Sequence, residues 1–272
     1  MPLPDDHHEH ELPPFSHSLN GWFMFYVGRY FRRHFHALRL LVDPAGESTL
    51  PDIAGEPVIF YTNHPGWWDP LVFLLLAGKC YPDRLSYGPI DAAALGKYRF
   101  MERIGFLGIE PHTRRGAARF LRMAKAANRR ADVIFWITSQ GEFVDPRSRP
   151  AGIRPGVAHA AAAAGRGMIV PLAVEYPFWS ERLPEALVAF GPAMRISDAG
   201  PRNAQEWHEV LEAALVATQD RLAEAAMRRD PQAFRILASG TVGVGWVYDC
   251  LRRCGAWWRG ERFDASHGGE QL

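Results

Sequence analysis

Short apolar segments alternate with helical patterns through the middle of the chain, from residue 46 to residue 200. Each apolar segment is rich in β-branched or aromatic residues and ends at turn residues, which predicts a strand. The predicted strands are 57–62, 84–88, 105–110, 132–137, 168–176 and 187–192. The helical patterns between them are 69–79, 90–100, 114–130 and 156–165. Strands interleaved with helices predict an α/β core with a mostly parallel sheet that is flanked by helices on both faces.

A helical pattern also precedes this core, over residues 18–45. Its first half is almost wholly apolar and aromatic, and its second half has an apolar stripe and a more polar, basic stripe. The apolar stripe is formed by Phe31, Phe35, Leu38 and Val42, and the basic stripe by Arg32, His36 and Arg39. An aromatic helix that becomes basic is typical of a helix that lies in a membrane interface. A helix packed on the core with a solvated basic edge has the same pattern, so both interpretations stay open.

The two ends of the chain have less regular patterns. Residues 1–17 lack the positive region and the apolar run of a signal peptide, and they predict a disordered tail. Residues 201–272 predict a helical region, because apolar residues recur at helical spacing from Ala204. Beyond Pro231 the chain is rich in glycine and tryptophan and has a basic end. We expect a second amphipathic helix there, packed either on the core or on a membrane surface.

Composition excludes several classes of protein. A formal net charge of +1 gives no global positive field of the kind that attracts nucleic acid, so we expect no nucleic-acid partner. The sequence has no apolar run of about 18 residues, the length that a membrane-spanning helix needs. Three cysteines, Cys80, Cys250 and Cys254, supply neither a disulfide framework nor a four-ligand metal set. We therefore expect no metal and a reducing, cytoplasmic setting.

Candidate chemistry is concentrated after the predicted strand 57–62. His64 follows this strand, and Asp69-Pro70 begins the next predicted helix. Ligands of open α/β sheets bind at the carboxyl ends of the strands. A carboxylate that accepts the Nδ1 proton of His64 would fix the tautomer and leave Nε2 free to take a proton from a hydroxyl. Both residues also have structural interpretations, because Asp69 can cap the helix that Pro70 starts and His64 can be an ordinary loop histidine.

The motif N-H-x-x-x-x-D, formed by Asn63, His64 and Asp69, resembles the signature of the lysophosphatidic acid and glycerol-3-phosphate acyltransferases. The resemblance implies that His64 deprotonates an acceptor hydroxyl while Asp69 orients it. It also implies that the acyl donor is a thioester, acyl-CoA or acyl carrier protein, which enters as a substrate and not as a bound cofactor. The acceptor would be a lipid of the lysophosphatidic acid type, and no acyl-enzyme intermediate would form.

Three later segments resemble further blocks of this family in the same order, so that the resemblance covers residues 57–174. In segment 105–121, Pro111 stands where the family has a phosphate-binding arginine, and Arg114 or Arg115 would have to replace it. In segment 135–150, Gln140-Gly141 replaces a Glu-Gly pair; segment 169–174 matches a strand with a Val-Pro core. The residues that the resemblance implies for substrate binding are Asn63, Arg114, Arg115, Gln140, Gly141, Arg147 and Arg149.

The departures leave the acceptor open. A planar guanidinium binds phosphate through two charge-assisted bonds, and the neutral amide of Gln140 cannot do so. The acceptor is therefore either a phosphate-bearing lysolipid or a molecule without phosphate at this site, such as a glycolipid or a glycosylated isoprenoid. Trp67 and Trp68 either line a path for the acyl chain or pack under the turn.

Two rival functions remain to be compared with acyl transfer. An α/β hydrolase would need a nucleophile elbow such as G-x-S-x-G, which the sequence lacks. A lipid-binding protein without catalysis would need neither His64 nor Asp69, although Gln140 in place of glutamate favours it. The sequence thus predicts a peripheral acyltransferase at the cytoplasmic face of a membrane.

Overall fold

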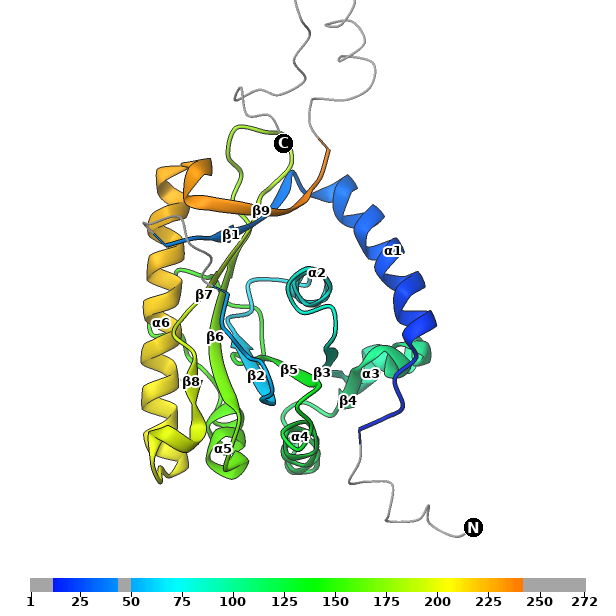
Figure 1. The fold of residues 1–272 in the computed structure, drawn as a ribbon, viewed down its shortest axis with the longest axis vertical. Coiled ribbons are helices and arrows are strands. Elements are labelled where there is room, and N and C mark those ends of the chain that lie inside the picture. Colours follow the sequence, from blue (N-terminus) through cyan, green and yellow to red (C-terminus); the bar gives the residue numbers. More distant parts are fainter. Residues whose placement is uncertain (1–11, 44–49, 242–272) are drawn as a thin grey trace, which may run out of the picture.

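The structure, a computed structural model, describes residues 12–43 and 50–241. These residues form a mixed, mostly parallel sheet of nine strands with helices on both of its faces (Figure 1). The strands lie in the order β4-β3-β5-β2-β6-β7-β1-β9, and β8 pairs with β6 outside this path. The expected α/β fold is therefore confirmed.

The elements have the following bounds. The α-helices are α1 His17–His34, α2 Asp69–Cys80, α3 Ala92–Lys97, α4 Arg114–Ala127, α5 Pro155–Ala164 and α6 Ala204–Arg228. The strands are β1 Ala37–Leu41, β2 Val58–Thr62, β3 Leu85–Asp91, β4 Phe106–Ile109, β5 Val133–Thr138, β6 Met168–Glu175, β7 Ala186–Phe190, β8 Met194–Arg195 and β9 Phe234–Ser239. Short 3₁₀ helices are η2 Arg99–Ile104, η3 Ile196–Ala199 and η4 Pro231–Ala233.

The alternation of side chains along the central strand explains the two layers of helices. In β2, Val58 and Phe60 are buried in the hydrophobic cluster on the side of α1 and α2, whereas Ile59 and Tyr61 are buried in the cluster on the side of α4, α5 and α6. A fully buried side chain of this size contributes about 1.5–3 kcal/mol to stability. Because both faces are buried, the strand is a continuous apolar run, as the sequence predicted.

The prediction of one helix over residues 18–45 is wrong in its second half. Helix α1 ends at His34, Phe35 is extended, and residues 37–41 form β1 with every side chain buried. The side chain of Arg39 is fully buried and its Nε donates to Glu185 at 2.9 Å, so it is not part of a solvated edge. Strand β1 pairs with β7 and β9, and this pairing satisfies backbone groups that a helix would have satisfied locally.

The helical prediction for residues 201–272 is also wrong in part. Helix α6 is present, but residues 234–239 form β9, the antiparallel partner of β1. Residues 242–272, which carry the rest of the expected second amphipathic helix, lie outside the described residues.

The prediction of a disordered tail over residues 1–17 is wrong for its last part. Leu12 and Phe15 pack against the core, and the carbonyl of Pro13 accepts a hydrogen bond from the hydroxyl of Tyr87 at 2.8 Å. Residues 1–11 lie outside the described residues. Within the described ranges, none of the helices is both long and apolar enough to span a membrane.

Candidate active site

Three neighbouring parallel strands, β5, β2 and β6, end at the same edge of the sheet. Each is followed within two residues by a residue of the site, Gln140 after β5, His64 after β2 and Tyr176 after β6. Parallel strands bring their carboxyl ends together, so residues that are far apart in the sequence meet here. The α/β fold thus places the predicted residues where such sheets bind ligands.

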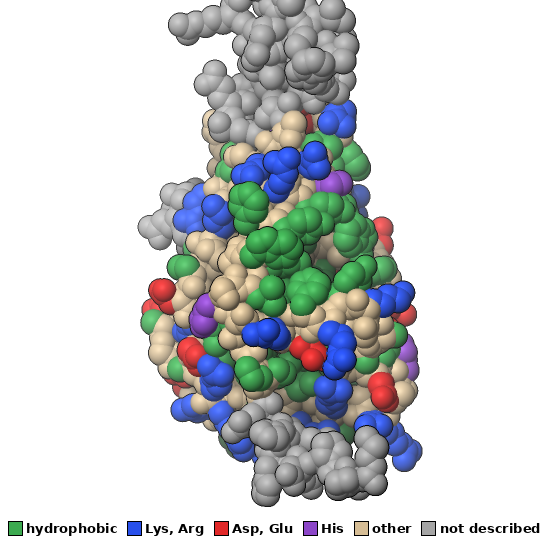
Figure 2. All heavy atoms as spheres, turned by 90° about the vertical axis from the view of Figure 1, so that its right-hand side faces the viewer, with side chains coloured by type: hydrophobic (Ala, Val, Ile, Leu, Met, Phe, Trp, Pro, Cys, Tyr) green, Lys and Arg blue, Asp and Glu red, His purple; other side chains and the backbone are tan. Residues whose placement is uncertain are grey.

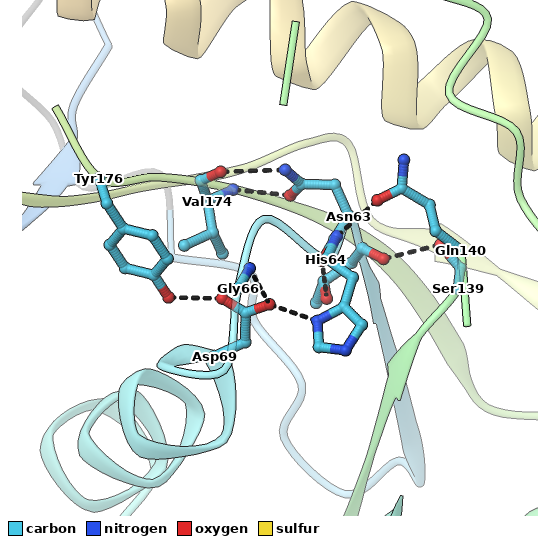
Figure 3. Close-up of polar contacts among 9 residues, drawn as sticks. Asn63, His64, Gly66, Asp69, Ser139, Gln140, Val174 and Tyr176 are labelled. Carbon is cyan, nitrogen blue, oxygen red and sulfur yellow. Dashed lines mark hydrogen bonds and ion pairs between the residues drawn. The ribbon is translucent and has the colours of Figure 1, made fainter. Parts of the chain in front are cut away.

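His64 and Asp69 form a hydrogen-bonded pair at this edge (Figure 3). The Nδ1 atom of His64 lies 2.5 Å from Oδ2 of Asp69. The carboxylate is fully buried, whereas the imidazole is 17% exposed. Because Nδ1 faces a carboxylate, it carries the proton, and Nε2, which points away from Asp69, is the basic nitrogen. The pair has the geometry of a general base with its orienting carboxylate.

Asp69 does not cap helix α2, so its structural interpretation is wrong. The capping position belongs to Trp68, whose side chain makes no capping bond, and Asp69 is the first helical residue. Its carboxylate accepts instead from His64, from the hydroxyl of Tyr176 at 2.5 Å and from the backbone N–H of Gly66 at 3.3 Å. Pro70 is the second helical residue, one position later than expected, and still lies in the first turn, where proline is tolerated.

Burial sets the electrostatics of this carboxylate. Burial raises the pKa of Asp69 above its ordinary value, and the hydrogen bonds from His64 and Tyr176 oppose that rise only in part. A more basic carboxylate is a stronger acceptor for the Nδ1 proton. The pKa of Tyr176 lies well above its ordinary value, first through burial and then through the neighbouring Asp69, so its hydroxyl stays protonated and donates.

Asn63 and Gln140 bind backbone groups and thereby hold His64 in place. The amide of Asn63, fully buried, donates to the carbonyl of Val174 at 2.9 Å and accepts from the N–H of the same residue at 2.8 Å. The amide of Gln140 accepts from the N–H of His64 at 2.6 Å and donates to the carbonyl of Ala151 at 2.7 Å. Both amides hydrogen-bond to backbone groups, so their geometry supports positioning of His64, and the expected contact with a substrate stays a prediction.

The amide at position 140 suits its surroundings better than a carboxylate would. The N–H of His64 needs an acceptor, and the carbonyl of Ala151 needs a donor. A glutamate carboxylate could accept from His64 but could not donate to Ala151. The replacement of glutamate by Gln140 is thus explained by local hydrogen bonding and does not by itself indicate a lost activity.

The four expected phosphate-binding arginines have two kinds of surroundings, because two lie near carboxylates and two are exposed at a helix start. Arg149 donates from Nε and Nη2 to Asp220 on α6, at 2.8 and 2.6 Å, and Nη2 of Arg147 lies 3.8 Å from the carboxylate of Glu175. Arg114 and Arg115 are exposed in the first turn of α4. At this helix end, backbone N–H groups and the helix dipole favour an anion.

Arg154 is a basic residue near the pair that the sequence did not reveal. Its Nε donates to the carbonyl of Gln140 at 3.0 Å, and its Nη1 lies 3.0 Å from Nδ1 of His112. Gly141 has a φ of 68°, and a Cβ there would lie 2.6 Å from the Arg154 side chain. Gly141 is therefore needed for the close approach of Arg154, and no signal in the sequence marked this contact.

Aromatic rings surround the loop of residues 63–68 between β2 and α2, the candidate catalytic loop. Trp68 packs inward, with its ring edge against Phe35 at a centroid distance of 4.9 Å. Trp67 stacks on Trp68 at 4.2 Å and is 57% exposed. Phe143, which no motif in the sequence marked, packs edge-on against His64 at a centroid distance of 4.7 Å. Packing under the turn therefore describes Trp68, whereas Trp67 remains a candidate for the acyl path.

His64 has no nucleophilic partner among the residues that the structure describes. The hydroxyl of Ser139 donates to the carbonyl of Thr62 at 2.7 Å, and the hydroxyl of Thr62 donates to the carbonyl of Asn63 at 2.7 Å. Both hydroxyls thus bind backbone and do not reach His64. Within the same residues, no cluster of three or more His, Cys, Asp or Glu side chains could hold a metal ion.

No model of a known protein family matches the sequence, and no curated protein matches it either. The chemistry of the site is therefore inferred from its geometry. An oriented imidazole with a basic Nε2, held by buried amides and without a serine or cysteine nucleophile in the described part of the chain, can take a proton from a hydroxyl that a substrate brings.

Proposed function

We propose that the protein is an acyltransferase that moves a fatty acyl group from an acyl thioester to a hydroxyl of a lysophosphatidic acid-type lipid. The observation that supports this most strongly is the 2.5 Å contact between Nδ1 of His64 and Asp69 at the carboxyl edge of the sheet. The N-H-x-x-x-x-D motif of Asn63, His64 and Asp69 adds the resemblance to the glycerolipid acyltransferases. Acyl-CoA or acyl carrier protein is the donor.

In this reaction His64 moves one proton. Nε2 takes the proton of the acceptor hydroxyl while the hydroxyl oxygen attacks the thioester carbonyl, and a C–O bond forms. The tetrahedral oxyanion then collapses, the C–S bond breaks, and the thiolate leaves with the proton that Nε2 returns. Asp69 stabilises the transient imidazolium and holds its orientation. General-base assistance of this kind is worth about 10²- to 10⁴-fold in rate.

The surroundings of the arginines bear on whether the acceptor carries a phosphate. A phosphate-bearing acceptor is supported by Arg154, which is hydrogen-bonded to the same residue that holds the His64 backbone, and by the exposed Arg114 and Arg115. A neutral acceptor, such as a glycolipid or a glycosylated isoprenoid, is supported by the carboxylate neighbours of Arg147 and Arg149. We favour the phosphate-bearing acceptor, because Arg154 is joined to His64 through a single residue, Gln140, and its side chain has no carboxylate partner among the residues that the structure describes.

A panel of acceptors tests these proposals. The wild type and His64→Ala are incubated with radiolabelled acyl-CoA or acyl carrier protein and with lysophosphatidic acid, glycerol-3-phosphate, lysophospholipids or glycosylated lipids. The matched control is His159→Ala, which removes an exposed histidine of α5. Label in the phosphate-bearing acceptors that depends on His64 supports the first class. Transfer only to glycosylated acceptors supports the second class. If the wild type leaves no more label in any acceptor than His64→Ala does, the result supports a lipid-binding protein without catalysis.

The cellular place that fits this activity is the cytoplasmic face of a membrane, with peripheral attachment. The acyl donors are cytoplasmic thioesters, and the acceptor is a lipid. The proposal needs neither a metal nor a bound cofactor, because proton transfer by His64 and departure of the thiolate complete the reaction.

A further inference from the structure

Helix α1 has hydrophobic side chains on two opposite faces. On the inner face, Val27 and Phe31 are buried in the core. On the outer face, Trp22 is 63% exposed, Phe25 69% and Tyr26 49%. The spacing of these three residues places them side by side on the helix surface. Isolated exposed rings are common in proteins, but three neighbouring ones on one helix face indicate a surface with a partner.

These rings continue from the helix to the catalytic loop. The rings of Trp22 and Tyr26 stack at a centroid distance of 6.5 Å, and those of Tyr26 and Tyr30 at 5.8 Å. The ring of Tyr30 then meets Trp67 edge-on at 6.5 Å. Trp67 lies between His64 and Asp69 in the sequence, so the row of rings ends at the catalytic loop.

Further exposed rings widen this surface at its other end. Tyr98 is 56% exposed and Phe100 38%, and Phe100 packs edge-on against Phe23 of α1 at 5.8 Å. Figure 2 shows the hydrophobic side chains gathered in one patch on the side of the molecule that carries α1. We call this surface the aromatic face, and its residues are Trp22, Phe25, Tyr26, Trp67, Tyr98 and Phe100.

Basic side chains border the aromatic face at both ends (Figure 2). Exposed Arg29, Arg32 and Arg33 follow the exposed rings along the last turns of α1. Exposed Lys97 and Arg99 flank Tyr98. Aromatic rings that sit at headgroup depth, with arginines and lysines that meet anionic headgroups, are the two components of an interfacial membrane contact.

We propose that the aromatic face docks the protein on an anionic lipid bilayer, so that a lipid acceptor reaches His64 directly from the membrane surface. The purpose of the docking rests on the proposed acyl transfer, whereas the binding itself needs no catalysis. The basic border favours an anionic bilayer over a neutral one. The row of rings ends at Trp67, which belongs to the same loop as His64. A membrane that contacts these rings therefore lies next to the proposed catalytic residue.

Vesicle sedimentation tests the surface in the full-length protein. The vesicles contain phosphatidylcholine alone or a mixture with phosphatidylglycerol. We expect the wild type to sediment with the mixed vesicles and more weakly with the neutral ones. Phe25→Glu should weaken binding about 10- to 100-fold, because it removes one aromatic ring that would be buried in the bilayer and adds a charge of the wrong sign. Arg32→Glu with Arg33→Glu should remove the preference for the anionic vesicles.

The control variant is Met227→Glu on α6, which lies on the other side of the sheet (Figure 1). Met227 is 67% exposed, so the same change is made at an equally accessible apolar residue. We expect this variant to sediment like the wild type. Failure of the wild type to sediment, or equal binding by Phe25→Glu, would overturn the proposal. A wild-type dimer in light scattering that Phe25→Glu converts to a monomer would also overturn it, because the face would then join two copies.

A second pair of measurements separates this proposal from the proposed activity. His64→Ala should sediment with the mixed vesicles as the wild type does. Phe25→Glu should lose acyl transfer to an acceptor in vesicles but retain transfer to the same acceptor dispersed in detergent. Sedimentation without acyl transfer would leave the docking surface intact and contradict the proposed reaction. Transfer in detergent without sedimentation would contradict the docking surface alone.

Discussion

The hydroxyl of Tyr176 donates to Oδ1 of Asp69 at 2.5 Å, while Oδ2 of the same carboxylate faces Nδ1 of His64 at 2.5 Å. Tyr176 follows β6, whereas His64 and Asp69 flank the loop after β2. The carboxylate is thus held from both sides by residues of two neighbouring strands. We therefore expect Tyr176 to position the proposed catalytic pair.

Tyr176→Phe should move the pH dependence of acyl transfer. The hydrogen bond from Tyr176 lowers the pKa of Asp69, so its loss makes the ionised carboxylate less favourable. The pKa of Asp69 then rises further, and a protonated Asp69 no longer accepts the Nδ1 proton that orients His64. We expect the acid limb of the profile of kcat/KM to move to higher pH, with a loss of about tenfold near neutral pH.

The matched control for this change is Tyr61→Phe. It also removes a buried hydroxyl, one that donates to the carbonyl of Leu211 at 3.0 Å on the other face of the sheet. We expect the acid limb of Tyr61→Phe to coincide with that of the wild type. An unchanged acid limb in Tyr176→Phe would assign Tyr176 a purely structural role.

Asp69→Asn should change the way in which the stability of the protein depends on pH. Burial raises the pKa of Asp69, so the folded protein binds this proton more tightly than the unfolded chain does. The ionised group therefore costs stability as the pH rises from the ordinary pKa of aspartate through the raised value. We expect the difference in Tm between Asp69→Asn and the wild type to grow in favour of the variant over that window. Thermal unfolding at a series of pH values measures it, and a difference that shrinks with rising pH would refute it.

Gln140→Glu should destabilise the protein. A carboxylate would keep the acceptor for the N–H of His64 but would set an oxygen against the carbonyl of Ala151. An unsatisfied buried acceptor of this kind costs about 1–3 kcal/mol. We expect a lower midpoint in urea unfolding, with no such change for Gln232→Glu at an exposed position. An equal midpoint in wild type and Gln140→Glu would contradict the hydrogen bonds that we assign to this amide.

Arg154→Ala and Arg149→Ala should differ in their effect on a phosphate-bearing acceptor. Arg154 is hydrogen-bonded beside the catalytic loop, and loss of one charge-assisted contact should raise KM for this acceptor about tenfold. Arg149 pairs with the exposed Asp220 on α6, so its loss should leave KM unchanged and cost less than about 1 kcal/mol of stability. Steady-state kinetics with lysophosphatidic acid would measure both, and a larger KM effect from Arg149→Ala would reverse the assignment.

The buried strands and the contact between His64 and Asp69 could be predicted from the sequence because their signals are local. The segment 57–62 is a continuous apolar run, and the five-residue separation of His64 and Asp69 spans a single loop. Tyr176 could not be predicted to join them, because its position depends on β6 lying next to β2. Arg154 depends in the same way on tertiary packing against Gln140.

The errors at residues 35–42 and 234–239 have one physical cause. Phe31, Phe35, Leu38 and Val42 keep a helical spacing across the end of α1, so the local pattern continued into what is a strand. Strand β1 is stabilised by β7 and by β9, which lies about two hundred residues later in the chain. Pairing over such a separation decides the structure and leaves no local signal.

The role of His64 as the general base of acyl transfer is tested most directly with radiolabelled acyl-CoA and lysophosphatidic acid. Product formation by the wild type is compared with that by His64→Ala. We predict that the wild type forms the diacylated product and that His64→Ala forms it about 10²- to 10⁴-fold more slowly, while His159→Ala is unaffected. Equal product with His64→Ala and the wild type would contradict the assignment of His64 as the general base.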